Sequence, residues 1–272
     1  MQNRTDLAVE SYESSSSTTI DGVIVDQKDD VTTVTVLNDN GARAIGKPIG
    51  KYITLQLEAF VSDSDIFDGR LEDFADILST IMPEPLESVL VACLGNERIT
   101  ADSLGPLTSN YILSTRHIIM DGDNTFGDLF PVATISTGVL GDTGIETAEI
   151  IKGVVAQIQP SLVIVVDALA ATSTNRLGTT VQFSDTGISP GSGVGNHRNE
   201  LSQSTLGVPV ISVGIPTVVS TSVISGDSSD TAFVTPREID RITQQGAKLI
   251  GMGINICFQK GITPAELYTL VG

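Results

Sequence analysis

Two apolar runs, each followed by an aspartate, constrain the fold of this chain more than any other feature. Val89–Leu94 leads through a Gly-Asn pair toward Asp102, and Leu162–Val166 leads directly into Asp167. Short runs of this kind that end in glycine or polar residues are typical of strands covered on both faces. In open α/β sheets the ligand crevice lies beyond the carboxyl ends of such strands. We therefore expect both carboxylates at that edge, where they could activate a water molecule for hydrolysis.

The rest of the apolar pattern predicts an α/β fold with a mostly parallel, doubly wound sheet and helices on both faces. From residue 88 onward, strand-like and helix-like segments alternate, as in chains whose parallel strands are joined by crossover helices. Three earlier strand-like runs indicate a small N-terminal β ribbon or sheet. The expected strands are Ile20–Val25, Val31–Leu37, Tyr52–Ala59, 88–94, 130–135, 162–167, 178–183 and 208–214. The expected helices are Arg70–Ile81, 101–114, 144–158, 196–204 and 236–258.

Capping residues mark several helix starts. Thr143 and Glu146 have the spacing of a capping box, and so do Thr263 and Glu266. Proline at the first helical position, as at Pro264, is a further start signal.

The N-terminal region differs in composition from the remainder of the chain. Residues 1–18 are polar and end in a run of serines, which is typical of a mobile arm and would suit a pro-segment. Residues 19–272 are expected to form a single α/β domain, since this length supports one large core. The first ten residues lack the apolar core of a signal peptide, and no apolar run approaches the roughly 20 residues of a membrane span.

Charge and cysteine content exclude some functions. The formal net charge is −18, whereas a nucleic-acid surface needs clustered lysine and arginine, so we expect no direct contact with nucleic acid. Cys93 and Cys257 lie in a strand-like and a helix-like pattern, as small buried hydrophobic residues of a reducing compartment do. We therefore expect a cytoplasmic protein that does not contact a membrane.

Asp102 and Asp167 have the features of an acid–base pair. If Thr100 caps a helix, Asp102 lies in its first turn, where the helix dipole and free N–H groups favour the ionised carboxylate. Asp167 follows five apolar residues, and poor solvation raises the pKa of a carboxyl group. Two carboxyls whose pKa values are pushed apart can serve as base and acid. The alternative is that Asp102 is only a helix charge and Asp167 only a turn residue.

A glycine-rich loop, residues 189–196, connects an expected strand to an expected helix. It lacks the sequence of a phosphate-binding loop. It therefore indicates either a structural turn or close approach to a bound peptide, with N–H groups aimed at a developing oxyanion. The candidate substrate-binding residues are Gly191, Gly193, Gly195, Asn196 and Asp185.

The tripeptide Asp-Thr-Gly occurs at 142–144 and at 185–187, and it is the signature of pepsin-like aspartic proteases. In those enzymes serine or threonine usually follows the glycine, whereas isoleucine follows both copies here. We interpret the first copy as a helix cap and the second as a turn.

No metal or cofactor site is expected. The only histidines are His117, which suggests a structural role, and His197, which is more typical of a solvent-facing residue than of a metal ligand. The sequence has no cluster of cysteine and histidine, and no serine or cysteine in a nucleophile motif.

Several stretches together resemble the germination protease (spore protease) family. The match covers residues 3–60 and 88–257 and is more specific than any single motif. Its most specific stretch runs from Ser184 to Asn196 and continues to Val219. The other stretches are Arg4–Glu10, Leu94–Asn96, Asp102–Pro106, Thr143–Thr147, Asp167–Ala171 and Thr235–Asp240.

The resemblance implies an endopeptidase, an atypical aspartic protease, that degrades small acid-soluble spore proteins during germination. It implies Asp102 and Asp167 as the catalytic pair, a zymogen made during sporulation, a homotetramer, and a location in the spore or forespore interior. The hexapeptide Thr5–Glu10 resembles the site that family members cut in their substrates. We therefore predict self-cleavage between Asp6 and Leu7; the alternative is an ordered edge strand that is never cut.

The chain departs from the family pattern in two places. The segment before Arg4 is very short compared with the usual pro-segment, and only Ser220–Phe233 stands where the family has a long insertion. Two other functions stay open. Gly95, Asn96 and Gly105, with an acidic residue between them, also resemble hydrogenase maturation proteases, endopeptidases of the same architecture that read a bound nickel. A non-catalytic binding protein on the same fold is the third possibility.

Overall fold

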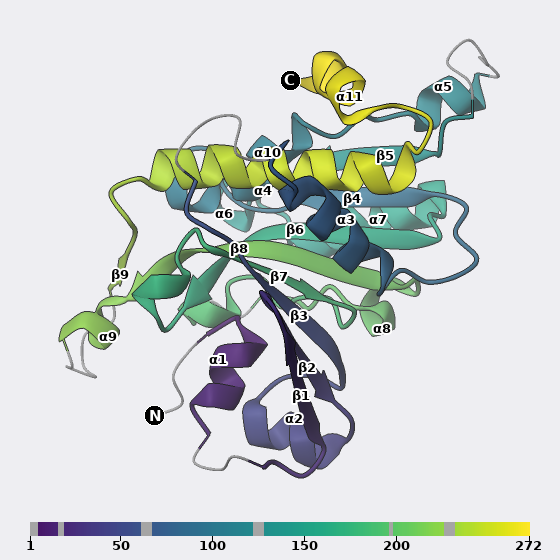
Figure 1. Cartoon of the computed structure of the whole chain (residues 1–272). Helices are drawn as coiled ribbons and strands as arrows, with labels where there is room; N and C mark the ends of the chain where they lie inside the picture. The colour runs from purple at the N-terminus through teal and green to yellow at the C-terminus, as the bar shows by residue number, and fades with distance from the viewer. Residues whose placement is uncertain (1–4, 16–18, 61–66, 122–127, 196–197, 226–231) are drawn as a thin grey trace.

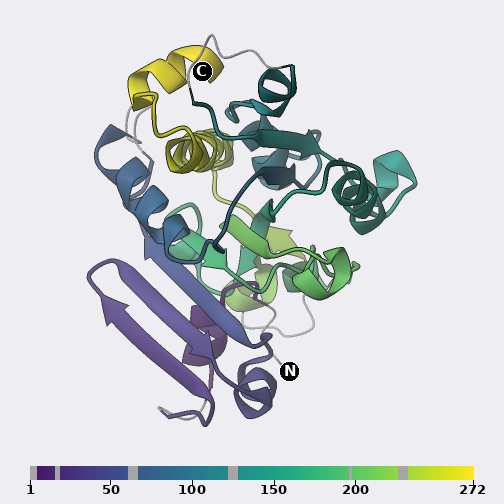
Figure 2. The ribbon, with the colours of Figure 1, turned by 90° about the vertical axis from the view of Figure 1, so that its right-hand side faces the viewer.

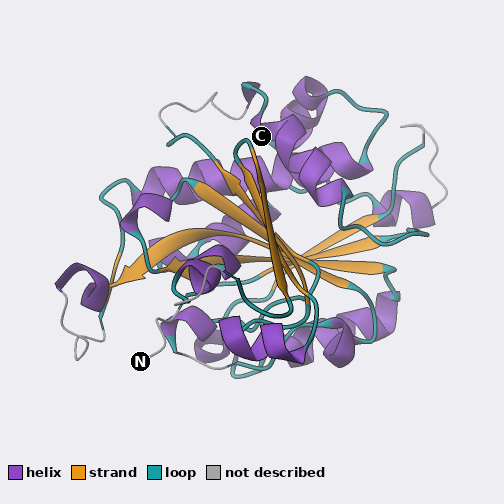
Figure 3. Ribbon diagram, turned by 60° about the horizontal axis from the view of Figure 1, so that its bottom comes forward, coloured by secondary structure: helices purple, strands orange, loops and turns teal. Residues whose placement is uncertain are grey.

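A nine-stranded sheet forms the centre of the molecule in the part of the chain that the structure describes (Figures 1 and 3). The structure is a computed structural model and describes residues 5–15, 19–60, 67–121, 128–195, 198–225 and 232–272. The strand order is β1-β2-β3-β7-β8-β6-β4-β5, and β9 pairs with β8. The strands are β1 (Val23–Lys28), β2 (Val31–Val36), β3 (Gly50–Gln56), β4 (Val89–Cys93), β5 (Val132–Ser136), β6 (Leu162–Ala171), β7 (Thr180–Ser184), β8 (Val210–Ser220) and β9 (Phe233–Val234).

The four strands β5, β4, β6 and β8 form a parallel centre, as the alternating pattern predicts. The register places Cys93 at the end of β4 opposite Val166, and Asp167 opposite Gly214 of β8. β7 runs antiparallel to β8, and the ribbon β1–β3 continues antiparallel from β7. The expected N-terminal ribbon is therefore one end of the same sheet, seen in purple in Figure 2.

Helices cover the two faces of the sheet because successive strand residues point to opposite sides. Val91 and Ile164 pack beneath α3, α4, α10 and α11, whereas Leu90 and Val163 pack against α7 and α8. The helices are α3 (Arg70–Ser79), α4 (Leu104–Ser109), α5 (Arg116–Met120), α6 (Leu140–Thr143), α7 (Thr147–Ile158), α8 (Gln203–Leu206), α9 (Thr221–Ser225), α10 (Ile239–Phe258) and α11 (Pro264–Val271). Three short 3₁₀ helices are η2 (Thr100–Asp102), η3 (Thr174–Arg176) and η4 (Ser192–Val194).

The N-terminal segment does not have the form expected of a mobile arm in its described part, residues 5–15. It contains α1 (Ala8–Glu13), which packs with α2 (Asp39–Ile45) against the ribbon (Figure 1). Leu7 and Ala8 are fully buried in a third hydrophobic cluster. The apolar triplet at 7–9 therefore anchors the segment, although the residues around it are polar.

Several element boundaries differ from the expected ones. The capping box at Thr263 and Glu266 is confirmed, but the one expected at Thr143 and Glu146 is wrong, because α7 begins only at Thr147. Instead, Thr143 ends α6, and the following glycine adopts a left-handed conformation as the C-cap. The helix expected at 196–204 reduces to the single turn of α8 within the described residues. None of the described helices combines the length and the hydropathy needed to cross a lipid bilayer.

Candidate active site

Asp102 and Asp167 line the same cleft, which has a volume of about 300 Å³. Asp102 follows β4 and Asp167 lies in β6, and the parallel pairing of these strands brings both residues to one edge of the sheet. Asp6 of the N-terminal segment and Gly191 of the glycine-rich loop line the same cleft. The two strands thus deliver both aspartates to one cleft, and the role of the pair stays a prediction.

A tight loop holds Asp102 in place. The N–H of Asn96 donates to the Asp102 carboxylate at 2.8 Å and to its carbonyl oxygen at 3.0 Å. Gly95 makes this approach possible: its φ is +118°, and a Cβ there would lie 2.0 Å from the Asp102 carbonyl oxygen. The expectation that Thr100 caps an α-helix is wrong, because Asp102 ends the 3₁₀ helix η2 and α4 begins at Leu104.

Asp167 is buried inside its strand, with 5% of its surface exposed. Strand β6 continues to Ala171, past the point where the sequence pattern predicts its end. The carboxylate accepts one main-chain hydrogen bond, from the N–H of Ala168 at 2.9 Å. Burial raises the pKa of Asp167 well above its ordinary value, and the negative charges of Asp102 and Asp6 raise it further.

The pKa of Asp102 is also raised, by burial, although the hydrogen bond from Asn96 opposes this shift. The sequence pattern predicts that a helix start favours the ionised form of Asp102. This prediction is wrong, because Asp102 is not in the first turn of an α-helix and burial raises its pKa instead of lowering it. Asp167 is the more buried of the two and feels the charge of Asp102, so it is the member that holds a proton most readily. Because the charge of Asp102 is one cause of the raised pKa of Asp167, the protonation of Asp167 depends on that of Asp102.

Replacing Asp167 by asparagine is expected to stabilise the fold at neutral pH. Because the folded-state pKa of Asp167 is raised, the folded chain binds a proton more tightly than the unfolded chain does. Ionised Asp167 therefore lowers stability at high pH, and the cost disappears as pH falls below the ordinary aspartate value of about 3.9. Thermal unfolding of Asp167→Asn and wild type across pH should show a gap that widens as pH rises. Equal thermal unfolding midpoints of the variant and the wild type at pH 7 would contradict the raised pKa of Asp167.

The N-terminal segment reaches the cleft through Asp6. Its carboxylate accepts hydrogen bonds from the Ser192 hydroxyl at 2.7 Å, the Gly193 N–H at 2.9 Å and the Ala170 N–H at 2.9 Å. The carbonyl oxygen of Asp6 accepts from Lys47 Nζ and from the side-chain amide of Gln182. The sequence pattern singled out Asp6 only as a cleavage-site residue, and it gave no signal for Lys47 or Gln182.

The candidate substrate-binding residues are not all brought together. Gly191 lines the cleft and Gly193 contacts Asp6, while Gly195 ends η4 with a φ of +75°. Asp185 is exposed beyond the end of β7, where its carboxylate accepts the N–H of Lys51 at 2.7 Å; it does not line the cleft. Asn196 lies outside the described residues.

Alanine at Gly193 or Gly195 is expected to lower kcat/KM more than it lowers stability. A Cβ on Gly193 would lie 2.3 Å from the Asp6 carboxylate and 2.8 Å from the Ala170 side chain, and both of these residues line the cleft. At Gly195 the left-handed backbone disfavours a Cβ, at a cost of about 1 kcal/mol. Steady-state kinetics and thermal unfolding of both variants measure the two effects. A fall in stability large enough to account for the lost activity would assign these glycines to folding.

The cleft also contains Arg198, a residue that the sequence pattern did not single out. Its guanidinium lies 3.5 Å from the carboxylate of Glu146 at the start of α7, and both side chains are partly exposed. Arg198 adds a positive charge to a cleft whose other charged lining residues are three aspartates.

His117 is not among the described residues that line this cleft. His117 lies in α5, away from the residues that line the cleft, and His197 lies outside the described residues. Among the residues that the structure describes, no three side chains of histidine, cysteine, aspartate or glutamate are grouped as metal ligands would be.

Comparison with known proteins confirms the family that the motifs predict. The family model described as germination protease matches residues 3–233. A germination protease of Caldanaerobacter subterraneus subsp. tengcongensis is 38% identical, and the alignment covers 98% of each chain. One from Clostridium acetobutylicum is 40% identical over 97% of each chain, and one from Bacillus cytotoxicus is 40% identical over 97% of this chain and 76% of the relative. Among solved structures, the NiFe hydrogenase maturation protease HycI from Thermococcus kodakarensis KOD1 is similar, with 18% identity and a TM-score of 0.40 over 66% of this chain and 99% of that one.

Proposed function

Because the chain belongs to the germination protease family, we propose that it is an aspartic-type endopeptidase whose catalytic pair is Asp102 and Asp167. The observation that carries this proposal is the placement of both carboxyls in one cleft at the carboxyl edge of the parallel strands. Raised pKa values at a paired carboxylate site are typical of groups that exchange protons in catalysis. The alternative, in which the two aspartates are only a helix charge and a turn residue, predicts that asparagine at either position leaves activity unchanged.

The proposed chemistry divides the work between the two carboxyls. Ionised Asp102 takes a proton from a water molecule while the water oxygen bonds to the carbonyl carbon of the substrate. Protonated Asp167 donates its proton to the carbonyl oxygen and so stabilises the tetrahedral intermediate. Collapse of the intermediate breaks the C–N bond. The proton held by Asp102 passes to the leaving amine, and one hydroxyl proton of the intermediate returns to Asp167, which leaves the carboxylic acid product and restores both aspartates. The buried environment of Asp167 keeps it protonated at a pH at which an exposed aspartate is ionised.

The proposed substrates are small acid-soluble spore proteins, cut during germination in the spore interior. This assignment follows the family resemblance. The test is incubation of the purified chain with such a protein and with an unrelated unfolded protein, followed by mass analysis of the products. We expect defined internal cuts in the spore protein at rates well above those in the unrelated one. If the chain cuts both proteins at equal rates, it is an endopeptidase, but small acid-soluble spore proteins are not its specific substrates.

The chain is also proposed to form a homotetramer and to be made as a zymogen in the forespore cytoplasm, again by family resemblance. Sedimentation equilibrium of the full chain measures the assembly directly. A monomer or dimer over the whole concentration range would exclude the tetramer.

Self-cleavage between Asp6 and Leu7 is the proposed processing step. The described segment lies with Asp6 in the cleft and Leu7 buried at the start of α1, so the cut separates a cleft-bound residue from a core-bound one. Incubation at mildly acidic pH should yield a chain that begins at Leu7, detected by mass analysis of the N-terminus. The Asp167→Asn variant should keep its original N-terminus under the same conditions. An intact N-terminus in fully active wild-type enzyme would instead indicate an ordered segment that is never cut.

A further inference from the structure

One part of the wall of the catalytic cleft has few attachments to the rest of the molecule. This part is the α6 segment, residues 138–145, in which Gly138 and Val139 line the cleft and α6 follows them. None of its residues is buried, and none belongs to the three hydrophobic clusters of the described chain. Segments with few buried apolar contacts open at a lower free energy than the core does. The core therefore does not fix this part of the wall in place.

The hydrogen bonds of the α6 segment hold it together as a unit. The carbonyl of Val139 accepts the N–H of Thr143 at 3.0 Å, and the carbonyl of Leu140 accepts the N–H of Gly144 at 2.8 Å. Within the described residues, the hydrogen bonds of the segment stay inside it or reach only the neighbouring Thr137. The segment can therefore change its position without breaking hydrogen bonds to the body of the protein.

Two ion pairs tie this region to other loops that border the cleft. Asp142 of the segment lies 3.6 Å from Arg98, in the loop after β4. Glu146, the residue after the segment, lies 3.5 Å from Arg198. The side chains of both pairs are partly or largely exposed, and solvent screens such pairs so that they contribute little to stability. They tether the α6 segment only weakly.

Glycine stands at both ends of the segment. Gly138 has a φ of +67° and Gly144 a φ of +70°, a region that other residues rarely adopt. A Cβ at Gly144 would meet no atom within 4 Å, so the backbone conformation and not packing favours glycine there. Glycine also changes its backbone angles at little steric cost, which suits a hinge. Gly144 completes the first Asp-Thr-Gly copy, to which the proposed catalytic pair gives no role.

We propose that the α6 segment is a lid that turns about Gly138 and Gly144 and closes over a peptide bound in the cleft. Only the identification of that peptide as a substrate rests on the proposed function; the lid stands on the attachments of the segment. Val139 is the side chain that the lid brings against the peptide, because it already lines the cleft. Closure removes bulk water from the aspartate pair and so strengthens the electrostatic interactions within the site.

The first test measures closure without turnover. The sequence has no tryptophan, so Leu140→Trp places a single fluorescent reporter in the lid. The protein is the full chain with Asp167→Asn, which blocks cleavage, and the ligand is the peptide with the sequence of residues 3–12. Anisotropy of a fluorescein-labelled copy measures its binding in a parallel titration. We expect the tryptophan emission to shift to shorter wavelength as the peptide binds, because closure shields the reporter from water.

A matched reporter lies outside the lid. Ile24 is 55% exposed on β1 of the ribbon, and its residue does not line the cleft. In the same Asp167→Asn background, the emission of Ile24→Trp should not change when the peptide binds. Circular dichroism checks the folding of each variant, and Ile145→Trp replaces Leu140→Trp if that variant is unfolded.

The second test asks whether the lid must move for turnover. Arg98→Cys and Asp142→Cys place one thiol on the loop after β4 and one on the lid, at side chains that contact each other. The native Cys93 and Cys257 are buried, so a bis-maleimide with a reducible disulfide spacer reacts with the introduced pair. We expect kcat/KM of the double variant to fall at least about tenfold when the spacer joins the two thiols, since turnover needs the lid to open and close. Reduction of the spacer should restore the activity that the variant had before it was joined.

The outcomes separate the lid from the proposed function. A peptide that binds without changing the emission of Leu140→Trp would overturn the lid, and so would full activity while the two thiols are joined. An equal shift of the Ile24→Trp emission would also overturn it, because the change would then not belong to the lid. If Leu140→Trp reports closure but the wild-type chain cleaves no peptide, the proposed function fails and the lid remains.

Discussion

Asp102→Asn and Asp167→Asn should each reduce peptide cleavage by about a hundredfold to ten-thousandfold. Asparagine cannot accept a proton from water or donate one as an acid, and loss of a general acid or base costs about 10² to 10⁴ in rate. Both side chains line the same cleft, so either change breaks the pair. The measurement is kcat/KM on the peptide with the sequence of residues 3–12, with product identified by mass.

The control for these variants is Asp142→Asn. Asp142 belongs to one of the two Asp-Thr-Gly copies, but in the structure it lies in α6 with its carboxylate 3.6 Å from exposed Arg98. Because exposed ion pairs contribute about 0–1 kcal/mol, this variant should fold and retain wild-type activity. Loss of activity in Asp142→Asn, together with normal activity in either variant of the proposed pair, would move the catalytic site to the Asp-Thr-Gly sequences.

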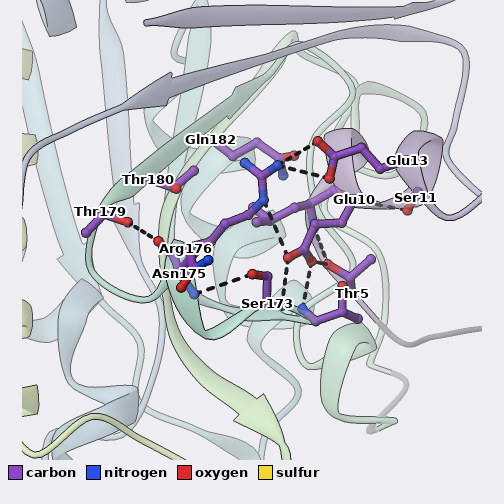
Figure 4. Close-up of polar contacts among 12 residues, drawn as sticks. Thr5, Glu10, Ser11, Glu13, Ser173, Asn175, Arg176, Thr179, Thr180 and Gln182 are labelled. Carbon is purple, nitrogen blue, oxygen red and sulfur yellow. Dashed lines mark hydrogen bonds and ion pairs between the residues drawn. The ribbon is translucent and has the colours of Figure 1, made fainter. Parts of the chain in front are cut away.

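Glu10→Ala should destabilise the chain by about 2–6 kcal/mol, because it leaves two main-chain N–H donors without an acceptor at a cost of about 1–3 kcal/mol each. Figure 4 shows the carboxylate of Glu10 at the centre of a network that joins α1 to the end of β6. It accepts the N–H groups of Thr172 at 2.7 Å and Ser173 at 2.9 Å, accepts the Thr5 hydroxyl, and lies 3.6 Å from Arg176. Glu10 is 3% exposed, so its removal leaves buried donors without an acceptor. Chemical denaturation of wild type and variant measures the difference.

Glu13→Ala is the matched control for this change. Glu13 also binds Arg176, with Oε1 and Oε2 at 2.8 and 3.0 Å from the same nitrogen, but its side chain is 54% exposed (Figure 4). An exposed ion pair of this kind contributes about 0–1 kcal/mol. If the two variants lose similar stability, the network does not fasten the N-terminal segment through Glu10.

The pattern of apolar runs predicts the centre of the fold because it has a simple physical cause. The apolar runs Val89–Cys93 of β4 and Leu162–Val166 of β6 are covered on both faces, so every residue in these two runs is apolar. Their placement beside each other follows from the parallel α/β arrangement. The carboxyl ends of parallel strands meet at one edge, which is why Asp102 and Asp167 could be paired from sequence.

The end of β6 could not be predicted in this way. A carboxylate after five apolar residues has the pattern of a strand end, yet β6 runs on through Ala168–Ala171 with Asp167 buried inside it. The residues after Asp167 are apolar and pair with β8, across an irregularity between Leu169 and Ala170. Tertiary burial outweighs the local preference of aspartate for a turn at this position.

The sequence pattern also did not predict that the N-terminal segment packs against the ribbon and places Asp6 at the cleft. Its polar composition indicates an arm, but three apolar residues, Leu7, Ala8 and Val9, are enough to bury it against the ribbon. The donors that hold Asp6 come from β6, β7, the glycine-rich loop and the residue after the C-cap of α2. Segments so far apart in the chain leave no common spacing from which their meeting could be inferred.

Asp102 and Asp167 are proposed to hydrolyse a peptide bond as a proton-sharing pair. The most direct measurement is the pH dependence of kcat/KM for the residue 3–12 peptide, with EDTA present throughout. We expect a bell-shaped profile whose descending limb follows the raised pKa of Asp167, since the acid must be protonated, and which EDTA does not lower. A profile that stays flat to alkaline pH, or activity that EDTA removes and added nickel restores, would contradict the account.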